Sequence, residues 1–198
     1  MTTKGNNMRE YAPLHLTILE HGARVAEPMP PGRVTMDDPA FSVMTDLREV
    51  SAATTRPEET IDAAHAIMIR RGVRLLFVLD HDGTVCGVIT ATDLLGEKPM
   101  RFMQARGVSH AEILVEDIMT PASMLEAMSM LDVAQMRVGH VVATLKAVGR
   151  KHLMVSEENG RRVRGLFSAS QVARQLGIEV QTFEVASSFA EVEAALVR

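Results

Sequence analysis

The segment from Gly87 to Asp93 has residue types and a spacing that can bind a phosphorylated ligand. An apolar run ends at Ile89, Thr90 follows it, and a carboxylate comes three positions later. Because the first N–H groups of a helix are unpaired, a helix that begins here can bind phosphate. The Thr90 hydroxyl adds a donor, and the Asp93 carboxylate can accept from the vicinal hydroxyls of a ribose. The same spacing is that of a plain capping box, and this alternative stays open.

Three basic residues stand where two predicted strands begin. Arg74 follows Gly72, while Lys151 and His152 follow Gly149. If the two strands belong to equivalent units, these groups converge and favour an anionic ligand. They can instead contact the carbonyl groups at the end of the preceding helix. If His152 contacts a phosphate, affinity is expected to rise as the pH falls through the ordinary histidine pKa of about 6.5.

The remaining reactive residue types do not suggest an enzyme. The seven histidines are scattered without metal-ligand spacing, and neither a Gly-x-Ser-x-Gly motif nor a Walker phosphate loop occurs. Cys86 lies in an apolar run and is expected to be a buried, inert thiol. We therefore predict no catalytic residues, no metal site and no required cofactor.

The elements that must position these groups occur twice in the sequence. Residues 87–93 resemble residues 165–171, and residues 72–74 resemble 149–151. Another pair, 42–45 and 117–120, precedes them in the same order and at nearly the same spacing. Ordered matches of this kind predict two homologous units, which tend to place equivalent clefts at a shared interface.

Each unit has the pattern of β-α-β-β-α, so the predicted fold class is α+β. Hydrophobic periodicity and turn residues set the expected boundaries. In the first unit these are strand 51–55, helix 60–71, the hairpin strands 75–79 and 84–89, and helix 90–95. In the second they are a helix that Asp132 caps and that runs to about Val148, the hairpin strands 152–156 and 163–167, and helix 168–176.

The chain divides into four parts on this basis. Residues 1–37 are expected to be a partly disordered arm, because residues 27–32 are rich in proline and glycine. The two repeats take residues 38–112 and 113–178. Residues 179–198 are expected to form a strand and a helix, the latter opened by a capping box at Ser188.

Composition limits the classes of function. Of 198 residues, 46% are hydrophobic and the formal net charge is −4, which does not suit a nucleic-acid-binding protein. Residues 168–177 look like a DNA-recognition helix, but they are predicted to follow a hairpin rather than a helix. A single cysteine excludes a disulfide framework. No apolar run is long enough for a membrane span, so we expect a cytoplasmic protein without membrane or nucleic-acid partners.

The duplicated segments resemble a tandem pair of CBS (cystathionine β-synthase) domains, also called a Bateman module. The resemblance covers residues 38–178. It depends on the Val/Ile-Met-Thr segments, Gly-Val-Arg at 72–74, and the ribose-phosphate pattern at 87–93. It implies two units about a pseudo-twofold axis with two clefts that bind adenosine compounds, namely AMP, ADP, ATP or S-adenosylmethionine.

The resemblance also implies which residues form each cleft. The first cleft would use Arg74, Val88, Ile89, Thr90, Ala91, Thr92, Asp93, Met128, Lys151 and His152. The second would use Ala53, Thr54, Ser168 and Gln171. Gln171 stands where the family has Asp or Asn, and an amide offers one neutral acceptor oxygen. We therefore expect the cleft built on Asp93 to bind the nucleotide more tightly.

These observations lead to one functional expectation and one alternative. We expect a regulatory or sensor protein, forming a homodimer, that binds an adenosine nucleotide between its repeats and acts on an unidentified regulated protein. The alternative is a ligand-free scaffold for dimerisation or docking. Clefts that a ligand occupies and fits in shape favour the sensor, and clefts filled by Phe77, Met154 or the N-terminal arm favour the scaffold.

Overall fold

The computed structural model describes residues 15–25 and 33–178. Residues 1–32 and 33–198 belong to two separate compact units. In the first unit, residues 15–25 are exposed and form neither helix nor strand. The predicted strand and helix of residues 179–198 lie outside the described residues. All elements named below belong to the second unit.

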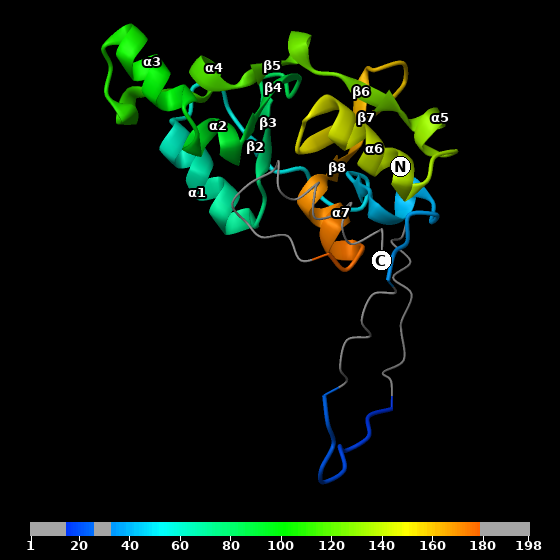
Figure 1. Cartoon of the computed structure of the whole chain (residues 1–198). Helices are drawn as coiled ribbons and strands as arrows, with labels where there is room; N and C mark the ends of the chain where they lie inside the picture. Colours follow the sequence, from blue (N-terminus) through cyan, green and yellow to red (C-terminus); the bar gives the residue numbers. More distant parts are fainter. Residues whose placement is uncertain (1–14, 26–32, 179–198) are drawn as a thin grey trace, which may run out of the picture. The chain divides into compact units, whose positions relative to one another are not determined.

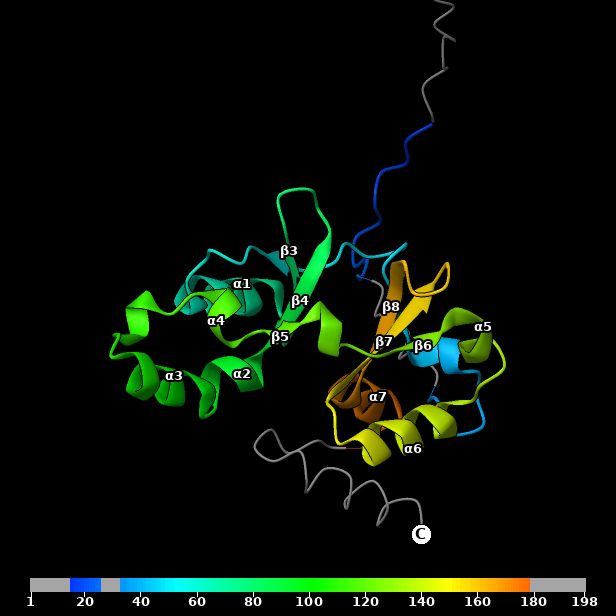
Figure 2. The same cartoon turned by 90° about the horizontal axis from the view of Figure 1, so that it is seen from above.

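The first of two four-stranded sheets has the order β2-β3-β4-β5. Its strands are β2 (Thr54–Thr55), β3 (Leu75–Leu79), β4 (Val85–Thr90) and β5 (Thr120–Pro121). The helices grouped with it in Figures 1 and 2 are α1 (Ile61–Arg71), α2 (Ala91–Leu95), α3 (Lys98–Arg106) and α4 (Val115–Ile118), with the 3-10 turn η2 (His110–Glu112). Within this sheet β2 and β3 pair in parallel, and the other neighbouring strands pair antiparallel.

The second sheet repeats this topology in the order β1-β8-β7-β6. Its strands are β1 (Thr45–Asp46), β6 (Ala127–Ser129), β7 (His152–Glu157) and β8 (Arg162–Ser168). Its helices are α5 (Met130–Val133), α6 (Val138–Val148) and α7 (Ala169–Gln175), with the 3-10 turn η1 (Ala40–Val43). The 3-10 turn η3 (Ala122–Met124) follows β5 and contacts β4 of the first sheet. In the second sheet β6 and β7 pair in parallel, and the other neighbouring strands pair antiparallel. The predicted α+β fold with two β-α-β-β-α repeats is confirmed.

Each sheet borrows its antiparallel edge strand from the sequence that precedes the other repeat. Strand β1 pairs with β8, and β5 pairs with β4. The borrowed strands pass very close to two glycines. A Cβ atom on Gly87 would lie 2.6 Å from the Thr120 carbonyl oxygen, and one on Gly165 would lie 2.7 Å from that of Thr45. This close approach explains why both copies of the repeat carry glycine there.

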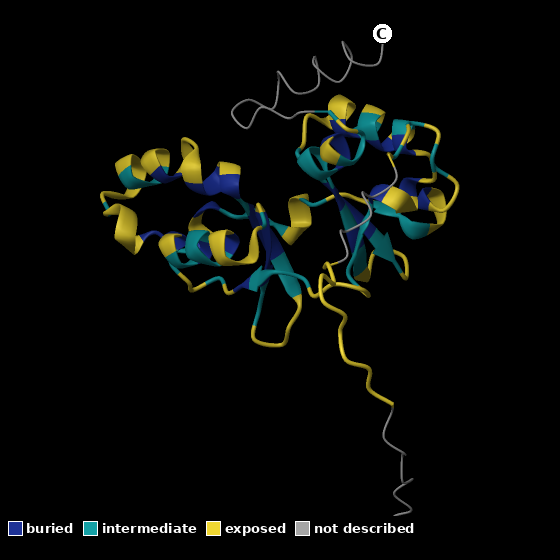
Figure 3. Ribbon diagram, turned by 90° about the horizontal axis from the view of Figure 1, so that it is seen from below, coloured by how far each residue is buried: buried dark blue, intermediate teal, exposed yellow. Residues whose placement is uncertain are grey.

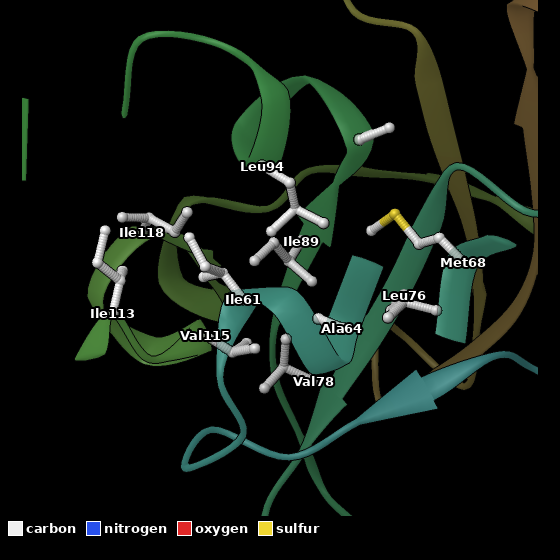
Figure 4. Packing of buried hydrophobic residues seen from close by; sticks show 11 residues of the cluster. Ile61, Ala64, Met68, Leu76, Val78, Ile89, Leu94, Ile113, Val115 and Ile118 are labelled. Carbon is white, nitrogen blue, oxygen red and sulfur yellow. The ribbon is translucent and has the colours of Figure 1, made fainter. Parts of the chain in front are cut away.

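The two larger hydrophobic cores each include residues from the other predicted repeat, as a consequence of this exchange of edge strands. The first core packs α1 against β3 and β4, and Figure 4 shows Ile113, Val115 and Ile118 within it. The second core includes Ala40 and Val43, which come before the first repeat's own sheet. Figure 3 shows the buried positions gathered on the strands and on the helix faces turned toward them.

The prediction of one continuous helix from Asp132 to Val148 is wrong. The structure has α5, which Ser129 caps, then a break, and then α6 from Val138. Backbone hydrogen bonds to Asp38 and to the first residue of η1 cause the break. The Ala40 N–H donates to the Met136 carbonyl and the Val138 N–H donates to that of Asp38, each at 2.9 Å. These long-range hydrogen bonds replace the helical ones. The sequence reading also omitted α3.

Candidate functional site

The backbone places the two predicted basic strand starts in equivalent positions. The Arg74 carbonyl accepts from the Ala91 N–H, and the Lys151 carbonyl accepts from the Ala169 N–H, both at 2.9 Å. Arg74 and Lys151 therefore lie beside the starts of α2 and α7. These helices have five and seven residues, too few to supply the macrodipole of a long helix. Side chains must carry most of any anion binding here.

In the first cleft, the Asp93 carboxylate has partners on both oxygens. Its Oδ2 accepts from the Thr90 N–H at 2.8 Å and from the Thr90 hydroxyl at 2.7 Å, which completes a capping box. Its Oδ1 lies 2.6 Å from Lys98 Nζ, and Asp93 is only 9% exposed. The expectation of a tighter first cleft assumed a carboxylate free for ribose, and that premise fails.

The apolar residues predicted for the first cleft have structural positions. Val88, Ile89 and Ala91 are buried in the hydrophobic clusters. Met128 packs against the second core, and Thr92 is exposed. The apolar side chains can shape a wall, and among these five residues only the Thr92 hydroxyl can donate a hydrogen bond through its side chain.

The basic groups of the two repeats do converge, as the repeat predicted. Burial and the nearby Arg74 guanidinium lower the pKa of Lys151. Burial, followed by the charges of Arg74 and Lys151, lowers the pKa of His152 to about 4, against a smaller opposite effect of Asp93. His152 is therefore neutral near pH 7 in the unliganded protein. The expected rise in affinity as the pH falls through 6.5 needs correction, because this histidine does not gain its proton there.

The lowered pKa of His152 predicts a loss of stability in mild acid. The unfolded chain binds this proton near pH 6.5, whereas the folded chain binds it only near pH 4. The free energy of unfolding should therefore fall by about 2 kcal/mol from this group between pH 7 and pH 5. Urea unfolding of wild type and His152→Gln at both pH values measures the difference, with the exposed His81→Gln as control. Equal losses in wild type and His152→Gln would contradict the assignment.

A cavity of about 380 Å³ lies at the second cleft, between residues of both repeats. Its walls come from the segment before β2, the end of α1, β3, β8 and α7. The lining residues are Thr45, Leu47, Val50, Ser51, Ala52, Ala53, Arg71, Gly72, Val73, Arg74, Leu75, Phe77, His152, Leu166, Ser168, Ser170, Gln171 and Arg174. No aspartate or glutamate is among them.

Three arginines give this cavity its charge. Arg71 donates to the Ser51 carbonyl at 3.2 Å, which fixes it at the end of α1. Within residues 15–25 and 33–178, no carboxylate pairs with Arg71, Arg74 or Arg174. The cavity therefore presents positive charge that the described protein does not neutralise, and an anion is the ligand that suits it.

The structure redistributes the predicted residues between the clefts. Arg74 and His152, predicted for the first cleft, line this cavity, since His152 pairs with Ser168 across the hairpin. Ala53 lines it as predicted. Thr54, its neighbour in the chain, lines instead a groove of about 680 Å³ between the two hairpins, because successive strand residues face opposite sides.

Gln171 contributes differently from the prediction. Its Oε1 accepts from the Thr45 hydroxyl at 3.1 Å, so the amide N–H groups are left for a ligand. The Ser168 hydroxyl lies 3.1 Å from that of Ser170. Sequence reasoning missed Arg71 and Arg174 altogether. The spacing of Arg174, three positions after Gln171, was a usable signal, because such residues share a helix face.

The bulky residues Phe77 and Met154 do not close the second cleft. Both are buried in a small cluster with Leu75 and Val88. Phe77 forms part of the wall of the 380 Å³ cavity and of the groove on the other side. The space beside Phe77 remains open, which favours the hypothesis of a nucleotide sensor over that of a ligand-free scaffold.

Other reactive groups have structural surroundings. The Cys86 thiol donates to the Val78 carbonyl at 3.2 Å, and burial raises its pKa. Arg164 pairs with Asp46 in partial burial. Among the described residues no cluster of three or more His, Cys, Asp or Glu side chains could hold a metal. None of the helices in the described chain is long and apolar enough to span a membrane.

Comparison with known proteins is consistent with this architecture. A model of the CBS domain matches residues 36–99. An uncharacterized conserved protein from Pyrococcus horikoshii is 23% identical, with a TM-score of 0.55, over 76% of this chain and 100% of that one. CBSX2 from Arabidopsis thaliana, solved in complex with AMP, is 19% identical, with a TM-score of 0.50, over 69% and 94%. No curated protein matches.

Proposed function

We propose that the chain is a regulatory module that binds a phosphate-bearing adenosine nucleotide, because residues 36–99 match a model of the CBS domain and the chain has the fold of CBS-pair proteins. The proposed site is the 380 Å³ cavity of the second cleft. The observation that carries the proposal is its three arginines, which pair with no carboxylate in the described chain, and the lack of any carboxylate among the lining residues.

The size and lining of the cavity support a small organic anion. Ligand pockets commonly have volumes of roughly 300–1,000 Å³ and mostly apolar walls with a few polar groups. Here Leu47, Ala53 and Phe77 offer apolar contact for a base. Gln171 and Ser168 offer hydrogen bonds to sugar hydroxyls, and the arginines suit phosphate oxygens. CBSX2, which has this fold, binds AMP.

Charge selects among the adenosine compounds. ADP and ATP carry more negative charge than AMP, and S-adenosylmethionine carries a net positive charge at neutral pH. A cavity with three arginines repels the sulfonium and attracts the phosphates. We therefore propose that ADP and ATP bind more tightly than AMP, and that S-adenosylmethionine binds weakly.

Thermal unfolding tests the proposal. A ligand at 100 times its dissociation constant adds about 2.7 kcal/mol to the free energy of unfolding. For a chain of this size the melting midpoint should rise by roughly 5–10 °C. We expect this rise with millimolar ADP or ATP and not with S-adenosylmethionine. A midpoint unchanged by AMP, ADP and ATP would contradict the nucleotide site and favour the ligand-free scaffold.

The proposal also covers the oligomeric state of the protein and the kind of partner that it regulates. We propose a homodimer without catalytic activity whose partner is a regulated protein, in the cytoplasm. Native mass spectrometry measures subunit number and bound nucleotide in one experiment. A monomer that retains nucleotide would remove the dimer from the proposal and leave the binding site.

A further inference from the structure

Lys98 occupies a special position beside the first cleft. Its ammonium lies 2.6 Å from Asp93 Oδ1 and donates to the Ile118 carbonyl at 2.9 Å. Lys98 is the first residue of α3, the nine-residue helix that follows α2 in the first repeat. In the second repeat, the residue five positions after Gln171, which corresponds to Lys98, is Leu176 and carries no charge. Gln171 accepts a hydrogen bond from Thr45 instead.

The Asp93 carboxylate is nearly inaccessible in this arrangement. The Asp93 side chain is 12% exposed, and that of Lys98 is 46% exposed. The Thr90 hydroxyl and N–H use the other carboxylate oxygen. A ribose would have to replace an ammonium with neutral hydroxyls, which exchanges a charge-assisted contact for weaker ones.

From these contacts we infer that Lys98 is a built-in cation that closes the ribose position of the first cleft, so that each chain binds one nucleotide, in the second cleft. The inference rests on the proposed nucleotide-binding function. It makes Lys98 the residue that determines stoichiometry. The two repeats then have different roles. Gln171 of the second repeat faces the ligand, whereas Asp93 of the first holds Lys98 of α3, which also donates to the Ile118 carbonyl of α4.

Calorimetric titration with ADP tests this stoichiometry. Wild type should bind one ADP per chain. Lys98→Met should expose Asp93 and add a second, weaker binding event. Asp93→Asn with Lys98→Met removes both charges, keeps an acceptor for the Thr90 cap, and should return the count to one. Arg101→Met, which removes an exposed ion pair with Glu97, the N-cap residue of the same helix, should behave as wild type.

The outcomes separate this inference from the proposed function. Two events in wild type, or a single event in a folded Lys98→Met protein, would overturn the role of Lys98 and leave nucleotide binding intact. If Lys98→Met does not fold, the double variant decides, because a loss of tenfold or more in its ADP affinity would show that Asp93 binds ligand. No ADP binding by any variant would contradict the proposed function itself.

Discussion

Replacing Arg74 and Arg174 together by alanine is expected to weaken ADP binding by about 100-fold or more. Both residues line the second-cleft cavity from different repeats, and both are exposed. Hydrogen bonds to charged groups are each worth about 1.5–3 kcal/mol, so the loss of two contacts gives about 3 kcal/mol or more. Because neither side chain is buried, the fold should survive the change.

A matched pair of substitutions separates local contacts from net charge. Arg70 and Arg106 are exposed and lie outside the cavity. Arg70→Ala with Arg106→Ala removes the same charge and should change ADP affinity by no more than about threefold, since exposed distant charges are screened. Calorimetry on both double variants gives the comparison. Equal losses would mean that only the overall field matters and that the cavity is not the site.

The second large effect concerns the borrowed strand β1. Asp46 on β1 forms an ion pair with Arg164 on β8, and their side chains are only 16% and 13% exposed. Glu157 on β7 lies 3.9 Å from Arg164 and also pairs with Arg48. Asp46→Ala leaves the Arg164 guanidinium without its nearest carboxylate. Breaking a buried pair in this way typically costs about 3–5 kcal/mol, and we expect about 3 kcal/mol because Glu157 remains.

Urea unfolding measures this cost directly, and a thermal melt checks it independently. A loss of about 3 kcal/mol should lower the melting midpoint by roughly 6–12 °C. The control is Arg101→Ala, which removes a pair whose side chains are 77% and 79% exposed and should cost less than about 0.5 kcal/mol. If Asp46→Ala is as mild as the control, the ion pair does not hold β1 in the second sheet.

The sequence predicted features that depend on neighbouring residues. Strand β3 was predicted with its observed bounds, and Gly72 and Gly149 end their helices in the left-handed conformation. The hairpin turns also lie where expected. These features were accessible because turn and cap residues act within a few positions of the chain.

Features that depend on distant contacts were not predictable from one sequence. The exchange of β1 and β5 joins residues more than thirty positions from their partners. The break before α6 arises from hydrogen bonds to Asp38 and Ala40. Likewise, only the folded geometry shows that Lys98 reaches Asp93 and that burial lowers the pKa of His152.

The central claim is that the second-cleft cavity holds the adenine nucleotide, and photoaffinity labelling tests it most directly. The protein is irradiated with 8-azido-ATP, with and without excess ATP, and the labelled peptides are identified by mass spectrometry. We expect label that ATP prevents on residues 45–53, 71–77, 152 or 166–174, the segments that contain the lining residues of the cavity. Label that ATP prevents only on other segments, or no such label at all, would contradict the account.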